Sequence, residues 1–283
     1  MVGTLYLVGT PIGNMEDITL RALRVLGEAS LIAAEDTRHS GRLLQHFGID
    51  KPLLSLHEHN EAGRIPTLLA ALARGEAVAL ITDAGTPALS DPGHQLLRAA
   101  IAAGHTLTPI PGPSALLAAL IPSGLPSDRF LFLGFPPRRP GARAEHLRAT
   151  AAEPGTLVWF ESAQRLPALL QDIAAILGPD RRVVVARELT KLHESFWRGT
   201  AEEAARVFSQ PPLGEIVVLV SGAPDEAAPA AGGEVATALA ALLAGGLAPT
   251  EAARLLASLT GLPRRTLYRL ATGRLEDDEP AGS

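Results

Sequence analysis

Strand-like and helix-like patterns alternate along the first two hundred or so residues. Short β-branched or leucine-rich runs predict strands at residues 5–8, 31–34, 53–56, 78–82, 106–110, 130–133, 156–161, 183–188 and 216–220. Alanine- and leucine-rich patterns predict helices between many of them, at residues 19–29, 62–74, 94–103, 163–177 and 201–208. Such alternation is typical of an α/β fold with largely parallel sheets that carry helices on their faces.

Two changes in composition divide the chain. Turn-forming residues are dense at 121–128, and an alanine-, glycine- and proline-rich stretch covers 221–233. Three short helical patterns follow, at residues 235–243, 249–259 and 264–272. We therefore expect an N-terminal α/β domain at 1–121, a second α/β domain at 122–221, a linker at 222–233, a helical domain resembling a helix-turn-helix at 234–275 and a tail at 276–283.

Missing residues and motifs exclude several classes of protein. The 283 residues include no cysteine, which rules out disulfide scaffolds, cysteine-based zinc sites, iron–sulfur clusters and a cysteine nucleophile. P-loop, dinucleotide-binding, nucleophile-elbow and zinc-protease motifs are also absent. The N-terminus lacks the pattern of a signal peptide, and no apolar run approaches the ~18 residues of a membrane span. We expect a soluble, cytosolic protein.

The charge is uneven along the chain. The formal net charge is −5, yet residues 252–275 contain no acid and five arginines, namely Arg254, Arg264, Arg265, Arg269 and Arg274. A basic end on an acidic body favours a polyanionic partner. An arginine-rich composition explains the same feature without such a partner, because Lys51 and Lys191 are the only lysines in the chain.

The loop after the fourth expected strand is the strongest functional signal. Its sequence, TDAGTPALSDPG, contains two glycines that permit positive φ and two prolines that stiffen it. In open α/β sheets, ligands bind outside the carboxyl ends of strands, where the strand order switches. Asp83, Thr86 and Ser90 can bind a polar ligand together with main-chain groups. The competing explanation is a turn in which Ser90 or Asp91 caps the next helix, but the loop is longer than such a turn needs, so we favour ligand binding.

Polar residues follow other expected strands as well. PGPSA places Ser114 at the expected start of a helix, where free N–H groups suit an anionic group or only the helix cap itself. GTPIGN and AEDTR follow the first two strands, and Glu35, Asp36 and Arg38 either line the same crevice or form a solvated cluster. The histidines of HEHN are better explained by surface or hydrogen-bonding roles than by a metal site, so we expect no metal.

Together and in chain order, the motifs GTPIGN, AAEDTR, HEHN, TDAGTPALSDPG, PGPSALLAAL, LPSDRF, ARELTK and GEIVVLV resemble the ribosomal RNA small subunit methyltransferase I family. That family belongs to the tetrapyrrole methylase superfamily of S-adenosylmethionine-dependent enzymes. The resemblance runs from about residue 4 to residue 220 and resumes in the C-terminal helices. It implies two α/β domains of the tetrapyrrole-methylase type with S-adenosylmethionine in the interdomain cleft, a small C-terminal helical domain, and a cytoplasmic homodimer. The implied activity is 2′-O-methylation of a cytidine ribose in the decoding centre of 16S rRNA, in the small ribosomal subunit.

The resemblance also implies which residues contact the cofactor. They are Asp83, Ala84, Gly85, Thr86, Pro87 and Ser114 and, by looser matches, Phe160, Leu189 and Leu213. One position departs from the family pattern, which commonly reads E-S-x-H-R. Here the segment is ESAQR, so Gln164 stands in place of the histidine and no imidazole is available there.

Methyl transfer to a ribose hydroxyl needs an oriented acceptor and a group that takes its proton. Candidates at strand ends are Glu35, Asp36 and Glu161 as proton acceptors, with Asn14, Arg38 or Arg165 as positioning groups. Arginine suits phosphate because its planar fork binds two oxygens at once, so Arg264, Arg265 and Arg269 are the expected RNA-binding residues.

Two other functions remain compatible with the sequence. One is a C-methyltransferase that acts on a precorrin-like tetrapyrrole, and the other is a non-enzymatic ligand sensor that binds nucleic acid. The basic C-terminal helices and the EDTR and HEHN motifs favour RNA over the tetrapyrrole as the acceptor.

Overall fold

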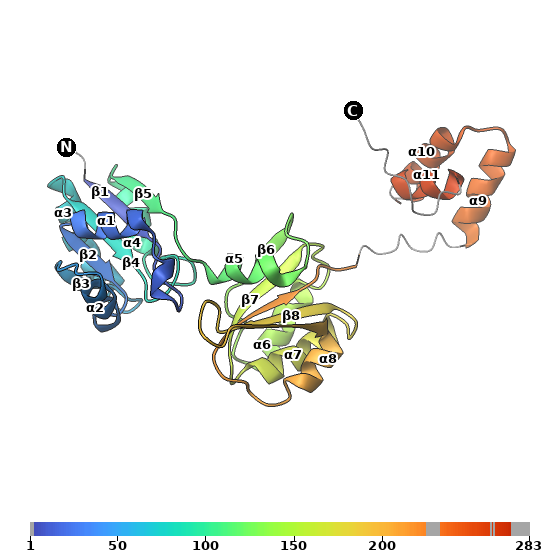
Figure 1. The fold of residues 1–283 in the computed structure, drawn as a ribbon. Coiled ribbons are helices and arrows are strands. Elements are labelled where there is room, and N and C mark those ends of the chain that lie inside the picture. The colour runs from blue at the N-terminus through green and yellow to red at the C-terminus, as the bar shows by residue number, and fades with distance from the viewer. Residues whose placement is uncertain (1–2, 225–232, 261, 263, 273–283) are drawn as a thin grey trace. The chain divides into compact units, whose positions relative to one another are not determined.

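The chain divides into two compact units, Met1–Gly222 and Ala223–Ser283. The computed structural model describes residues 3–224, 233–260, 262 and 264–272 (Figure 1). The first unit contains two five-stranded sheets, and the described part of the second is helical. The finer domain boundaries at 121 and at 233 stay a prediction.

The first sheet is entirely parallel and has the strand order β3-β2-β4-β1-β5. Its strands are β1 (Thr4–Val8), β2 (Leu31–Ala34), β3 (Leu53–Ser55), β4 (Ala77–Ile81) and β5 (Thr106–Ile110). These are the first five strands expected from the sequence, within a residue or so at each end. The adjacent strands β1 and β4 continue into helices on opposite faces of the sheet, so a switch point lies at their carboxyl ends.

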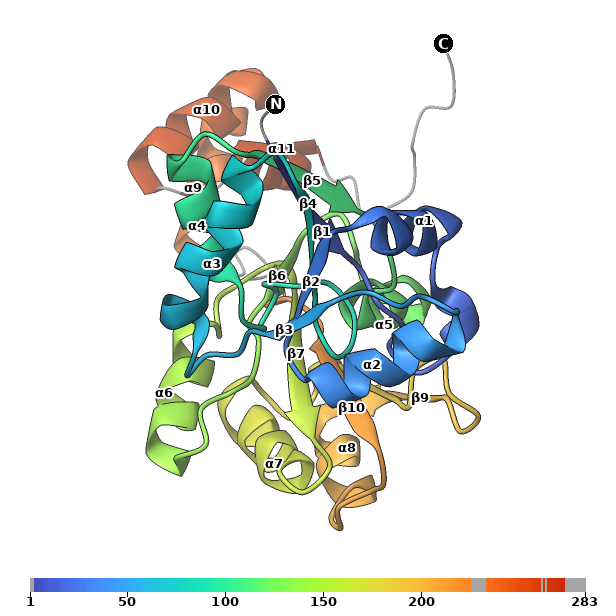
Figure 2. The ribbon, with the colours of Figure 1, turned by 90° about the vertical axis from the view of Figure 1, so that its left-hand side faces the viewer.

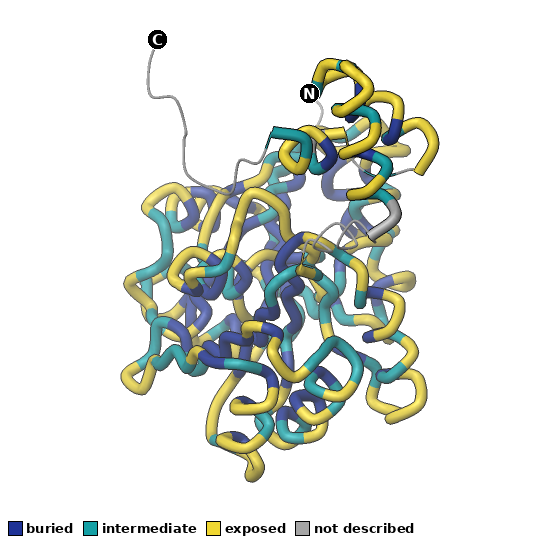
Figure 3. The backbone as a smooth tube through the Cα atoms, turned by 90° about the vertical axis from the view of Figure 1, so that its right-hand side faces the viewer, coloured by how far each residue is buried: buried dark blue, intermediate teal, exposed yellow. Residues whose placement is uncertain are grey.

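Four helices cover the two faces of this sheet (Figure 2). Helices α1 (Leu20–Glu28) and α2 (Thr37–His46) pack on one face, and α3 (Glu61–Ala73) and α4 (His94–Ala102) pack on the other. Burial on both faces explains why strands such as β4 are continuously apolar. Figure 3 colours the buried stretches of the backbone dark blue. The sequence did not predict α2, because most of its residues are polar and few apolar ones mark the side that it buries.

The second sheet corrects the expectation of largely parallel sheets. Its order is β6-β7-β10-β8-β9, and only the β6–β7 pair is parallel. Its strands are β6 (Phe130–Phe132), β7 (Thr156–Ser162), β8 (Arg182–Arg187), β9 (Ser195–Thr200) and β10 (Glu215–Val220). The sequence pattern did not predict β9, which a short loop joins to β8. A parallel pair needs a crossover of roughly a dozen residues or more, so a short connection forces the antiparallel arrangement.

The second sheet is also covered on both faces. Helices α6 (Pro140–Ala149), α7 (Leu166–Ile176) and α8 (Ala201–Val207) bury one face around Trp159. Helix α5 (Ala115–Leu120) packs on the other face, in a cluster that also contains Ile12 from the loop after β1. Because this cluster joins Ile12 to residues of the second sheet, it holds the loop after β1 against that sheet.

The second unit has a small core of its own. Helices α9 (Gly233–Ala244), α10 (Pro249–Thr260) and α11 (Arg264–Thr272) agree with the three helices predicted there. They bury Leu239, Ala252, Ala253, Leu256 and Leu267. Parts of the expected linker and tail, residues 225–232 and 276–283, lie outside the described residues.

Candidate functional site

The loops that follow β1 and β4 are joined directly to each other. Thr10 and Gly85 exchange two backbone hydrogen bonds, with N to O distances of 2.9 and 3.1 Å. The hydroxyl of Thr10, which is fully buried, also donates to the Thr82 carbonyl at 3.0 Å. Small residues make this contact feasible, since a side chain at Gly85 (φ +85°) would point toward Ile12. The GTPIGN and DAGTP motifs therefore form one structure at the switch point of the first sheet.

The DAGTPALSDPG loop is conformationally strained. Its backbone has positive φ at Gly85, Ala88, Ser90 and Gly93, and such values cost free energy when the residue is not glycine. Helix α4 begins after Gly93, and no side chain caps it. The alternative in which Ser90 or Asp91 caps this helix is therefore wrong.

A second strained loop faces the first from the other sheet. Glu188 and Thr190, in the segment after β8, also have positive φ. With Ala88 and Ser90 they are the non-glycine residues in this conformation in the described part of the chain. Lys191 ties this segment to β10, because its ammonium group pairs with Glu188 at 3.0 Å and with Glu215 at 2.8 Å. Hydrogen bonds from the Glu215 backbone and from Lys191 hold the pKa of Glu188 below its ordinary value. Strain confined to two facing loops points to a functional site.

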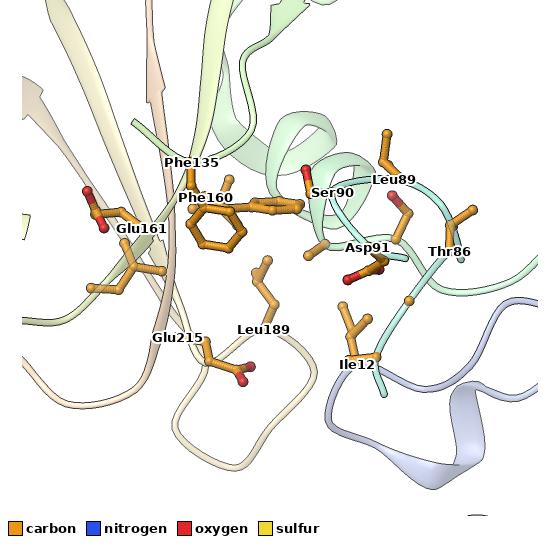
Figure 4. Close-up of a pocket in the computed structure, with 16 residues that line it drawn as sticks. Ile12, Thr86, Leu89, Ser90, Asp91, Phe135, Phe160, Glu161, Leu189 and Glu215 are labelled. Atoms are coloured by element: carbon orange, nitrogen blue, oxygen red, sulfur yellow. The ribbon is translucent and has the colours of Figure 1, made fainter. Parts of the chain in front are cut away.

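A pocket of about 230 Å³ lies between these loops, within the first unit (Figure 4). One wall comes from the first sheet and its loops: Ile12, Ala84, Gly85, Thr86, Leu89, Ser90, Asp91, Ser114 and Ala115. The opposite wall comes from the second sheet: Phe135, Phe160, Glu161, Leu189, Glu215, Ile216 and Val217. The first wall offers small side chains, hydroxyls and main-chain groups, whereas the second is mostly apolar. An amphipathic ligand with one polar and one flat apolar part fits between them.

Phe160 is fixed in the apolar wall by two other aromatic rings. Its ring centroid lies 4.8 Å from that of Phe132 and 5.7 Å from that of Phe135, both in edge-on geometry. Its backbone N–H donates to Gly134 at 2.9 Å. A rigid aromatic surface of this kind suits a planar heterocycle.

Six of the nine expected cofactor residues line the pocket: Ala84, Gly85, Thr86, Ser114, Phe160 and Leu189. Ser114 is the N-cap residue of α5, as expected, but its side chain makes no capping hydrogen bond. Asp83 and Pro87 belong to the same loop without lining the pocket. Leu213 lies outside the lining and is 86% exposed, in the segment before β10.

Of the five expected catalytic residues, only Glu161 lines the pocket. Its side chain is buried and forms an ion pair with Arg165 at 2.8 Å. Glu35 accepts a hydrogen bond from the Thr82 hydroxyl at 2.8 Å. Neither residue lines the pocket. Asn14 accepts from the Glu16 N–H at the start of a short 3₁₀ helix, at 3.1 Å.

Asp36 and Arg38 form the solvated pair that was the alternative interpretation. The guanidinium of Arg38 lies 2.8 Å from Asp36 and is largely exposed. Hydrogen bonds from Arg38 hold the pKa of Asp36 far below its ordinary value, so this carboxylate is a weak base. The Asp36 backbone N–H donates to the Asp83 carboxylate at 3.1 Å, which links this pair to the loop after β4.

Asp91 lines the pocket and has a shifted pKa, although it is not among the expected catalytic residues. Burial, followed by the negative charge of Glu35, raises the pKa of Asp91 to about 6. Burial also raises the pKa of the neighbouring Asp83. The sequence contained only one signal for Asp91, namely its position in a long loop after an apolar strand.

Replacing Asp91 with asparagine should stabilise the protein at pH 8 by about 1 kcal/mol. The pKa of Asp91 is higher in the folded protein than its ordinary value of 3.8, so folding favours the protonated carboxyl. The contribution of Asp91 to stability is therefore full below pH 3.8 and is lost as the pH rises through 6. At pH 8 the ionised carboxylate destabilises the fold, and asparagine removes that cost. Complete burial would make the cost about 3 kcal/mol, but partial solvent contact reduces it. Urea unfolding at pH 8 and pH 4 checks this: a variant equally stabilised at both values would contradict it.

The expected RNA-binding residues lie on α11 in the second unit. Arg264 and Arg269 are exposed there, together with Tyr268. Arg265 belongs to the same helix, but its side chain, like all of Arg274, lies outside the described part. Helix α10 ends at Thr260 and α11 begins at Arg264, a spacing compatible with a helix-turn-helix.

Within the described residues, no group of three or more histidine, cysteine, aspartate or glutamate side chains could hold a metal ion. His57 and His59 lie after β3 rather than on it, and the Asn60 amide contacts the His57 ring at 3.0 Å. None of the described helices is long and apolar enough to cross a membrane.

Comparison with known proteins gives two family matches and one consistent set of relatives. Residues 4–205 match the family of tetrapyrrole (corrin/porphyrin) methylases, and residues 229–275 match the RsmI C-terminal HTH domain. A ribosomal RNA small subunit methyltransferase I from Synechocystis sp. is 48% identical and aligns over 95% of this chain and 98% of its own length. The protein of the same name from Escherichia coli O157:H7 is 47% identical over 95% of this chain and 94% of its own length.

Solved structures share the fold at low sequence identity. The uroporphyrin-III-C-methyltransferase of Thermus thermophilus has a TM-score of 0.55 at 24% identity, covering 77% of this chain and 94% of its own. A cobalt precorrin-4 methyltransferase has a TM-score of 0.56 at 19% identity, with the same coverage. The expected tetrapyrrole-methylase fold, with two α/β sheets and a C-terminal helical region, is confirmed. With its full-length relatives and both family matches, the chain belongs to the ribosomal RNA small subunit methyltransferase I family, a methyltransferase family within the tetrapyrrole methylases.

Proposed function

We propose that the protein transfers a methyl group from S-adenosylmethionine to the 2′-oxygen of a cytidine ribose in the decoding centre of 16S rRNA. The observation that carries this proposal is the pocket between the two strained loops, in a chain that belongs to an rRNA methyltransferase family. The family supports the reaction class and the RNA, while the pocket supports the methyl donor.

The pocket fits S-adenosylmethionine on two grounds. The apolar wall of Phe160 and Leu189 offers a flat surface for the adenine ring. The opposite wall offers main-chain groups of Ala84 and Gly85 and the hydroxyls of Thr86 and Ser114 for the polar parts of the molecule. When bound, the cofactor supplies a methyl group on a positively charged sulfur. Asp83 and Pro87 would act by shaping the loop, and Leu213 would contact the ligand only from the rim.

The chain's own residues have to orient the acceptor and remove its proton. Correct orientation is worth roughly 7–11 kcal/mol of barrier in well-arranged systems. Glu161 is committed to Arg165, so we assign these two residues to positioning. Asn14 lies in the loop after β1, and Glu35, Asp36 and Arg38 follow β2. We assign these four residues to holding the acceptor nucleotide.

The second unit is proposed to bind the rRNA through α11. Changing Arg264 and Arg269 to glutamine should weaken rRNA binding and lower the logarithmic salt slope by about 0.7 for each single-strand phosphate that is no longer neutralised. Cofactor affinity should not change, because these residues lie outside the first unit. Arg24→Gln, which removes an exposed arginine from α1, is the matched control. An unchanged salt slope in the α11 variant would remove the RNA role from this helix.

The expected organisation belongs to the same proposal. It comprises domains at 1–121 and 122–221, a linker at 222–233, a helical domain at 234–275, a tail at 276–283 and a cytoplasmic homodimer. Exposed apolar side chains of Leu117, Ile121 and Phe130 support association of two copies, and the ribosomal substrate supports the location.

The deciding experiment incubates the purified protein with tritiated S-adenosylmethionine and one of three acceptors. These are 30S subunits, protein-free 16S rRNA and a uroporphyrinogen-type macrocycle. Label that appears in a 2′-O-methylcytidine after nuclease digestion supports the proposal. Label in the macrocycle would favour the tetrapyrrole alternative, and specific rRNA binding with no transfer to any acceptor would favour the sensor. Calorimetry with S-adenosylhomocysteine tests the cofactor pocket separately.

A further inference from the structure

The segment between β6 and α6 lies at the rim of the pocket and is held at two points. The Phe160 N–H donates to the Gly134 carbonyl at 2.9 Å, which continues the pairing of this segment with β7. The guanidinium of Arg165 donates to the carbonyl of Pro136, a buried residue, at 2.5 Å. Phe135 therefore stands between two anchored residues, and its backbone has little freedom to lose when a ligand binds.

The ring of Phe135 is exposed although its backbone is fixed. Phe135 lines the pocket, is 57% exposed and packs edge-on against Phe160, with 5.7 Å between the ring centroids. In Figure 4 the two rings lie on the opposite side of the pocket from Ile12 and Thr86. Because Phe160 is assigned to the adenine of the cofactor, the exposed part of the Phe135 ring is left for a second flat group.

Two arginines that carry uncompensated charge follow Phe135. Arg138 and Arg139 are exposed, and neither forms an ion pair with any described residue, whereas the next arginine, Arg143, is buried against Asp172 at 2.6 Å. The first turn of α6 contains no acidic residue that could neutralise them. Arg139 has extended backbone, with φ −75° and ψ 129°, and successive side chains of extended backbone point to opposite sides. The two guanidinium groups are therefore placed to bind two different anions.

We propose that residues 135–139 are the surface of the first unit that recognises the acceptor strand, an inference that rests on the proposed function. Phe135 stacks on the base of the acceptor nucleotide, and Arg138 and Arg139 bind the phosphates next to it. An aromatic ring beside cationic groups suits single-stranded RNA, because every base has a flat face and every nucleotide carries a phosphate. A nucleotide must leave the base stack before its ribose can enter a pocket, and stacking on Phe135 compensates for that loss.

The first test removes the two charges from the full-length protein. Combining Arg138→Gln with Arg139→Gln should lower the logarithmic salt slope of rRNA binding by about 1.4, which is about 0.7 for each of two single-strand phosphates. Binding is measured with 30S subunits and with protein-free 16S rRNA. Combining Arg148→Gln with Arg206→Gln is the matched control, because it removes two exposed arginines from the last turn of α6 and from α8. Equal salt slopes in the two double variants would overturn the phosphate contacts.

The second test separates stacking from packing at Phe135. Phe135→Leu keeps an apolar side chain against Phe160 but has no flat face, so it should raise the Kd for rRNA by about 5–150-fold. Phe135→Tyr keeps the ring and should restore rRNA binding. Calorimetry should find the same Kd for S-adenosylhomocysteine in both variants and in the wild type. Urea unfolding should find similar stabilities, since the side chain that changes is more than half exposed.

Three results would overturn the role of Phe135. They are an unchanged rRNA affinity in Phe135→Leu, a Kd for S-adenosylhomocysteine that rises as much as the Kd for rRNA, and a Phe135→Tyr variant that binds rRNA no better than Phe135→Leu. The second result would make Phe135 a cofactor contact instead. If the wild type methylates rRNA and the variants bind it equally well, this inference alone fails. If the wild type neither binds nor methylates any rRNA, the proposed function fails and takes this occupant with it.

Discussion

Replacing Gly9 with alanine should destabilise the protein by about 1–3 kcal/mol and lower kcat/KM by about 100-fold. Gly9 follows β1, and a Cβ atom there would lie 2.9 Å from the Cα atom of Gly112, which follows β5. Both groups are backbone, so neither can rotate away. The two loops would have to separate, and they carry Thr10, which holds Gly85, and Ser114, which lines the pocket. Small displacements of positioning groups are costly in catalysis.

A second glycine provides the control for this effect. Gly27 lies within α1, and a Cβ atom there would meet nothing within 4 Å. Gly27→Ala should therefore stabilise the protein by about 0.5–1 kcal/mol, since alanine loses less entropy in a helix. Urea unfolding and steady-state kinetics on both variants make the comparison. Equal stabilities for the two alanine variants would show that the contact between Gly9 and Gly112 carries no strain.

The first sheet could be predicted closely because its signal is local. Each strand is a short apolar run next to an amphipathic helix, and parallel βαβ units repeat that pattern. The switch point at the ends of β1 and β4 then places the TPIGN and DAGTP motifs side by side. The pocket wall formed by Ala84, Gly85, Thr86 and Ser114 therefore follows from the sequence pattern and the family resemblance together.

The second sheet could not be predicted in the same way, because strand direction depends on pairing between distant segments. β10 is as continuously apolar as a parallel strand, yet it runs antiparallel to both β7 and β8. Edge strand β9 mixes aromatic, charged and small residues, so it carries no clear alternation. Burial on both faces, rather than direction, produces the apolar run in β10.

The same limit applies to the site. Ile12, Phe135 and Glu215 line the pocket only because the two sheets bring distant loops together. In the sequence Asp91 resembles a helix cap, whereas in the fold burial and the nearby carboxylates of Glu35 and Asp83 raise its pKa. Conversely, Asp36 and Arg38 lie at a strand end as predicted, but they form an ion pair with each other and do not line the pocket. A motif identifies which loop matters, and the fold decides which of its side chains meet.

Replacing Arg165 with methionine should destabilise the protein by about 3–5 kcal/mol at neutral pH, because it leaves the buried carboxylate of Glu161 without a cation. The Glu161 side chain is 1% exposed, and Arg165 lies 2.8 Å from it while also donating to the Pro136 carbonyl at 2.5 Å. Methionine keeps most of the apolar stem, so lost packing contributes little.

The exposed pair of Arg24 and Glu28 supplies the control, since both side chains are more than half exposed. Arg24→Met should cost less than about 1 kcal/mol, as surface ion pairs do. Adding Glu161→Gln to Arg165→Met should restore more than half of the lost stability, because the uncompensated charge is then removed. Urea unfolding of these three variants and of the wild type measures the differences. If the double variant is no more stable than Arg165→Met, the loss comes from packing at Pro136 and not from the buried charge, and Glu161 does not depend on Arg165 for its place in the pocket wall.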